Sequence, residues 1–79
     1  MEDDFNLYKL IIKSVESQIK ENDPPITKET YDRLLSNGRD AMTAKEMIAS
    51  VIAEEIYLMM SDNRQINLDT FTQRLSELQ

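Results

Sequence analysis

The longest apolar run of the chain lies over 43–61. Thr43 is a favourable N-cap, and Glu46 follows three positions later, where its carboxylate can reach back to the N–H of the cap. Met42 and Met47 flank this start in the spacing of a hydrophobic staple. Apolar side chains cover most of the circumference of the predicted helix, which is typical of a helix that others surround. We therefore expect a central helix over about 43–61.

A first long helix is predicted upstream of this segment. Asp3 or Asp4 can cap its start, where an acidic side chain favours the helix dipole, and it continues to about Glu21. Pro24 and Pro25 follow, and the residue before a proline is disfavoured in the helical region, so we expect an extended connector there. The apolar residues of this helix recur at steps of three and four: Phe5, Tyr8, Ile12, Val15 and Ile19.

Two short helices complete the pattern. One is expected over 28–37, with Thr27 as its N-cap and Gly38 as a left-handed C-cap. The other begins after Asn67, a favourable cap, and extends for about ten residues. The apolar residues of this last helix lie on one face: Leu68, Phe71, Leu75 and Leu78.

These four segments predict an all-α fold in the order long, short, long, short. Connections of about four to six residues suit neighbouring helices, and a chain of 79 residues makes one domain, 1–79. The single glycine and two prolines are too few for the turns of a β-rich fold. We expect a compact four-helix, bundle-like domain.

The composition narrows the function classes. The net charge of −6 opposes attraction to nucleic acid and to anionic lipid. The chain has no Cys and no His, which removes thiolate chemistry, the commonest general base and the commonest transition-metal ligand. One glycine cannot build a glycine-rich phosphate loop, and no apolar run is long enough for a membrane span. We expect no enzyme activity, no catalytic or metal site, no cofactor and no small-molecule ligand, and the acidic start of the chain favours a cytoplasmic protein.

Glu55 lies within the apolar part of the circumference of the predicted central helix. A buried carboxylate is costly unless it is paired or protonated, and its candidate partners are Arg33, Arg74 and the hydroxyls of Tyr8 and Tyr31. We interpret Glu55 as a structural buried carboxylate that ties two helices together, with Arg33 as the favoured partner. The alternatives are a pocket or interface carboxylate, or a position at the rim of the core.

Apolar side chains outside the predicted core faces form a candidate interaction patch. Leu7 and Leu10 lie outside the apolar face of the first helix. They therefore pack against a second neighbouring helix, are exposed to solvent, or form a dimer contact. The apolar arc of the central helix is wider than three small neighbours can cover, which adds Ala49, Ile56 and Met60 to the patch. Adaptable core packing is the alternative for the methionines. We expect a protein partner or a second copy of the chain, as in a homodimer.

A nucleic-acid-associated regulator is the alternative function. The helices over 28–37 and 43–61, with Gly38 between them, have the order of a helix-turn-helix. The second helix would then present an acidic stripe to DNA: Glu46, Ser50, Glu54 and Ser61. A small, acidic protein–protein interaction or accessory module is therefore the favoured function.

Several short motifs occur together between Asp23 and Leu78: Asp23-Pro24-Pro25, Thr30-Tyr31-x-Arg33-Leu34, Gly38, Ile48-Ala49-x-Val51, Glu54-Glu55-Ile56, Phe71 and Leu75 to Leu78. As a set they resemble a small bacterial all-helical domain of unknown function. The spacing from the glycine to Ala44 is longer here, and the Cys/His tail that accompanies some such domains is absent. The resemblance implies a helical fold and a bacterial source, and it implies no settled activity and no metal site.

Overall fold

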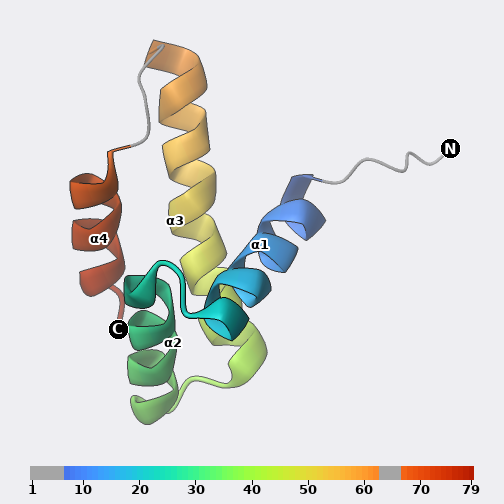
Figure 1. Ribbon diagram of the computed structural model, residues 1–79, viewed down its shortest axis with the longest axis vertical. Coiled ribbons are helices and arrows are strands. Elements are labelled where there is room, and N and C mark those ends of the chain that lie inside the picture. The colour runs from blue at the N-terminus through green and yellow to red at the C-terminus, as the bar shows by residue number, and fades with distance from the viewer. Residues whose placement is uncertain (1–6, 63–66) are drawn as a thin grey trace, which may run out of the picture.

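The computed structural model describes residues 7–62 and 67–79, without the side chain of residue 62. This part of the chain is helical, with no strand, so the predicted all-α, bundle-like fold is confirmed. The expected acidic cap of the first helix lies outside the described residues. The helices are α1 (Leu7–Glu21), α2 (Pro25–Ser36), α3 (Ala41–Asp62) and α4 (Leu68–Ser76) (Figure 1).

α3 is the central helix, because it packs against each of the other three. α2 also packs against α1 and α4, at the end of the molecule where α3 begins. Within the described residues α1 and α4 do not pack against each other, and they lie on either side of α3 (Figure 1). The core takes residues from all four helices: Ile11, Val15, Leu34, Ala44, Ile48, Ala49, Val51, Phe71 and Leu75.

The start of α3 differs from the prediction. The helix begins at Ala41, and the cap is Asp40, whose Oδ1 accepts a hydrogen bond from the Thr43 N–H at 2.7 Å. This bond holds the pKa of the Asp40 carboxyl below its usual value. Thr43 is therefore a first-turn residue and no N-cap, and the predicted capping box with Glu46 and the staple of Met42 with Met47 are wrong. A carboxylate interacts with the helix dipole more strongly than a hydroxyl, which favours the earlier start.

The start of α2 also lies earlier than predicted. The helix begins at Pro25, with Pro24 in the extended N-cap position, and it ends at Ser36 instead of residue 37. Proline favours the first helical position because its fixed φ suits the helix and its missing N–H would have no intrahelical partner. Thr27, expected as the N-cap, is buried in the first turn, and its hydroxyl donates to Gln18 Oε1 at 2.7 Å.

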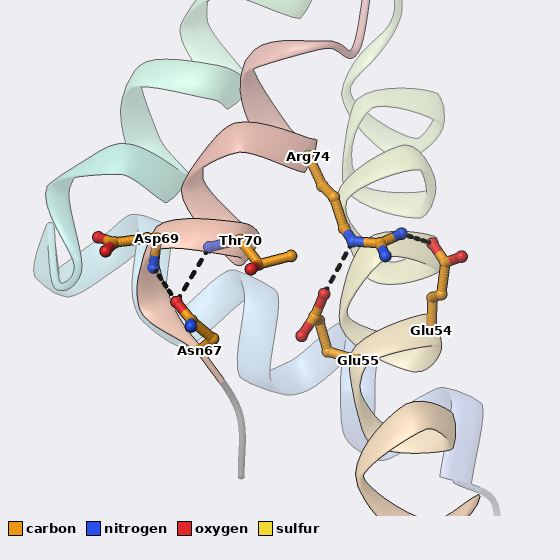
Figure 2. A network of polar contacts seen from close by, with 6 residues as sticks. All are labelled: Glu54, Glu55, Asn67, Asp69, Thr70 and Arg74. Atoms are coloured by element: carbon orange, nitrogen blue, oxygen red, sulfur yellow. Dashed lines mark hydrogen bonds and ion pairs between the residues drawn. The ribbon is translucent and has the colours of Figure 1, made fainter. Parts of the chain in front are cut away.

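Three helix ends have the conformation or the capping hydrogen bonds that their own residue type favours. Gly38 has φ +96°, so the predicted left-handed C-cap of α2 is confirmed. Asn22, after α1, adopts the same region with φ +56°, which asparagine tolerates better than most residues. The predicted cap of α4 is also confirmed, because Asn67 Oδ1 accepts from the N–H groups of Asp69 and Thr70 (Figure 2).

Candidate functional site

A groove of about 330 Å³ lies over the second half of α3, between α1 and α4. It exists because α1 and α4 both pack on α3 without packing on each other. The lining is mostly apolar, and its polar groups are a hydroxyl, an amide and a carboxylate. The residues that line the groove are Ser14 and Gln18 of α1, Ile52, Glu55 and Ile56 of α3, and Leu68 and Phe71 of α4.

Large apolar side chains extend this surface beyond the groove. Leu7 and Leu10 precede Ser14 by seven and four residues, so they lie on the same face of α1 as the groove wall. Met59 follows Ile52 by seven residues, so it continues the groove face along α3. We use the name groove surface for the lining residues together with four exposed side chains: Leu7, Leu10, Met59 and Met60.

Glu55 lies at the floor of the groove and is only 4% exposed. Its Oε2 is 2.9 Å from Nε of Arg74, which projects from α4 (Figure 2). Nη1 of the same guanidinium is 2.6 Å from Oε1 of Glu54, whose side chain is about half exposed. One cation is therefore shared by two carboxylates, and this cluster carries a net charge of −1.

The inner contact of this cluster is an ion pair without a well-directed hydrogen bond. Glu55 Oε2 and Arg74 Nε are both buried, and neither makes a hydrogen bond of favourable angle despite their 2.9 Å separation. The attraction is therefore between charges, and the accepting capacity of this carboxylate oxygen is not used. The second oxygen of Glu55 points away from Arg74 (Figure 2), so the carboxylate can still accept hydrogen bonds.

The expected contact between Glu55 and Arg33 does not form. Arg33 Nη2 instead donates to the carbonyl oxygens of Leu75 at 2.8 Å and Leu78 at 3.0 Å. Leu75 lies in the last turn of α4 and Leu78 just beyond its end, so a guanidinium from α2 donates to carbonyl oxygens at the C-terminal end of this helix. Arg74, the other arginine named from the sequence, is the partner because α4 runs beside the part of α3 that carries Glu55 (Figure 2).

The candidate patch divides into a surface part and a buried part. Leu7, Leu10 and Met60 are exposed, the last at 75%, and Ile56 is half-buried in the groove wall. Ala49 is 2% exposed, so its assignment to the patch is wrong. It lies in the first half of α3, where α1 and α2 both cover the helix.

Sequence reasoning missed the contribution of α4 to the groove. Leu68 and Phe71 belong to the apolar face predicted for the last helix, and on that face Phe71 is buried whereas Leu68 is 60% exposed. Leu68 lies in the first turn, just after the Asn67 cap. This position could have indicated its exposure, because the end of a helix projects beyond a small core.

A second hollow, of about 290 Å³, lies on the other side of α1. Here the Tyr8 hydroxyl donates to Glu46 Oε2 at 2.9 Å, and this bond raises the pKa of the phenol by favouring its neutral form. Nearby, Lys45 Nζ is 3.1 Å from Glu16 Oε2. These are surface contacts that hold α1 on α3.

The helix-turn-helix-like pair is α2 and α3. The solvent-facing residues that α3 offers as a recognition face are acidic or neutral: Glu46, Ser50, Glu54 and Ser61. In the described part of the chain, no three potential metal-ligating side chains come together, and no helix has both the length and the apolar character of a membrane span.

In comparisons with known proteins, no family model, no curated protein and no solved structure matches this chain.

Proposed function

We propose that this chain is a small acidic protein–protein interaction or accessory module that binds another protein through the groove surface. The observation that carries the proposal is the exposed apolar wall of the groove, where Leu68 is 60% exposed and stands beside Ile52, Ile56 and Phe71. Large contiguous apolar patches on a protein surface mark interaction sites.

The position of the patch supports this proposal. The exposed residues come from three helices, so the surface is shaped by tertiary packing and is held by the core beneath it. Glu55 and Arg74 connect α3 and α4, which holds the α4 wall of the groove on its α3 floor. A rigid apolar surface loses little conformational entropy when a partner binds.

The charge of the chain supports a protein partner over nucleic acid. The net charge is −6, and the exposed face of α3 carries Glu46 and Glu54. Phosphates would be repelled by this face, so no observation favours the helix-turn-helix alternative. The setting that we propose is the bacterial cytoplasm, as the sequence resemblance and the acidic composition suggest.

The proposal is tested by affinity capture from an extract of the source organism with three baits. They are the wild-type chain, Leu68→Lys in the groove wall, and Leu35→Lys as a control. Leu35 is an exposed leucine of α2 that does not line the groove, so both variants place a lysine on a helix surface. Circular dichroism checks that both variants keep the helical fold.

We expect a protein that is retained by the wild-type chain and by Leu35→Lys and is lost with Leu68→Lys. Light scattering of the purified chain should give its monomer mass of 9.2 kDa. Identical capture by all three baits, with a monomer in solution, would show that the groove surface binds no protein.

A further inference from the structure

We infer that the partner presents an amphipathic helical segment, with apolar side chains that enter the groove and one Lys or Arg that reaches Glu55. This inference rests on the proposed function and names the chemistry of the partner. It follows from the charge of the groove floor, the accepting capacity of Glu55 and the way three helices shape the groove.

Among the described residues, the printed ion pairs leave the charge at the groove floor unbalanced. Arg74 Nε lies 2.9 Å from Glu55, and Arg74 Nη1 lies 2.6 Å from Glu54. Two carboxylates face one guanidinium, and the chain as a whole carries −6. A cation from a partner would neutralise the cluster in a site where water is largely excluded, which is where a charge pair is strongest.

The hydrogen bonding of Glu55 is incomplete in the same place. Its Oε2 is buried without a hydrogen bond of favourable angle, and its other oxygen points away from Arg74 (Figure 2). A carboxylate can accept several hydrogen bonds, while Lys and Arg carry only donors. A Lys or Arg side chain in the groove would supply these donors, and charge-assisted hydrogen bonds are the strong ones.

The shape of the groove suits a helix. α1 and α4 form its walls and α3 forms its floor, so a further helix laid in it would contact three helices, as a core helix does. The apolar lining, from Ile52, Ile56, Leu68 and Phe71, would receive side chains spaced at i, i+3 or i+4 and i+7 of the incoming helix. Leu7, Leu10 and Met59 extend the apolar surface beyond the groove.

A second copy of the chain fits these features less well. Each copy carries −6, so two copies repel each other as they approach. A basic amphipathic segment is attracted by the same charge, and it brings a second cation to the two carboxylates that share Arg74. Charge complementarity therefore favours a different protein as the occupant.

The test selects binding peptides from a displayed library of random segments of about 15 residues, which is about four helical turns. The immobilised wild-type chain is the target, and Leu68→Lys and Leu35→Lys are counter-targets. We expect the enriched peptides to combine a helical apolar pattern with a Lys or Arg at its edge. They should bind wild type and Leu35→Lys and lose binding to Leu68→Lys.

The role of Glu55 is tested with the peptide that binds most tightly and with two variants of the chain that have the same net charge. Glu55→Gln and Glu29→Gln each remove one negative charge, and Glu29 is exposed on α2 outside the groove. By fluorescence anisotropy, Glu55→Gln should weaken binding on the order of tenfold, because it removes a largely desolvated charge pair. Glu29→Gln should change the affinity by about twofold or less, because an exposed charge is screened. When Leu replaces the basic residue of the peptide, the two variants should bind equally.

The outcomes separate this inference from the proposed function. Enriched peptides without a basic residue, equal effects of Glu55→Gln and Glu29→Gln, or no enriched peptides would overturn the inference. A dimer in light scattering that Leu68→Lys dissolves would also overturn it, because the occupant would be a second copy, while the groove surface would remain an interaction site.

Discussion

The two halves of α3 contain the same number of apolar residues, but neighbouring helices bury more of the first half and leave much of the second half exposed. Residues 41–51 and 52–62 each contain seven residues of the Ala, Val, Ile, Leu, Met and Tyr types. In the first half Ala44, Ile48, Ala49 and Val51 are buried. In the second half Glu55 is the only buried residue among the described side chains, and Tyr57 and Met60 are 67% and 75% exposed.

The difference follows from the number of neighbouring helices. α1 and α2 both cover the first half, whereas the second half has α4 on one side and the open groove between α4 and α1 (Figure 1). An apolar circumference therefore indicates how much surface a helix could bury, and neighbours decide how much it does bury. The first half stabilises the fold, and the second half is the part of α3 that we propose as a recognition surface.

The largest expected difference between the two halves is in the cost of truncating an apolar side chain. Ile48→Ala should lower the free energy of unfolding by about 3 kcal/mol, because Ile48 is fully buried and the change leaves a cavity. Met60→Ala, its counterpart in the second half, should change it by less than about 0.5 kcal/mol. Urea denaturation measures both, and similar losses would show that the second half is also part of the core.

An intermediate effect is expected at Glu55 and Arg74, where the second half of α3 contacts α4 at the groove. Arg74→Met should cost about 2 kcal/mol, because it leaves the buried Glu55 carboxylate without a cation. Glu55→Gln should cost about 1 kcal/mol, because Arg74 keeps its contact with Glu54.

The matched control for this pair is Glu54→Gln, which removes the outer and more exposed contact of the same guanidinium. We expect a loss below about 0.5 kcal/mol, as for surface ion pairs. Chemical denaturation with a circular dichroism readout ranks the three variants. If Glu54→Gln were as costly as Glu55→Gln, burial of the inner pair would have no energetic consequence.

The smallest expected effect concerns the start of the buried half, where Asp40 caps α3. Its folded-state pKa is lowered by the hydrogen bond from the Thr43 N–H. The ionised cap therefore stabilises the fold above the unfolded-state pKa of about 3.9, and this contribution is lost as the pH falls through the lower folded-state pKa. Asp40→Asn keeps a good cap that does not titrate.

The free energy of unfolding of the wild type and Asp40→Asn should be compared across acidic pH. The stability advantage of wild type should shrink as the pH falls below about 4, because only the wild-type cap becomes protonated. A difference between the two proteins that stays constant over this range would contradict the assignment of Asp40 as the cap.

Much of the fold could be predicted from local chemistry. The helical periodicity, the left-handed Gly38 and the Asn67 cap depend on residues close in sequence, and the structure confirms them. Two predicted helix starts, with Thr27 and Thr43 as N-caps, were wrong. In both places the sequence also offers an earlier residue that favours a helix start. Pro25 and Asp40 each begin a helix earlier than threonine would, because proline suits the first helical position and a carboxylate favours the helix dipole.

The candidate site could be predicted only in part. The sequence alone singled out Glu55 as a misfit in an apolar arc, and it named Arg74 among the possible partners. The tertiary structure decided that Arg74 pairs with Glu55, that Arg33 caps α4 instead, and that Ala49 is buried while Leu68 is exposed. The physical reason is that helix type and caps depend on neighbours along the chain, whereas burial and ion pairing depend on which helices pack together in space.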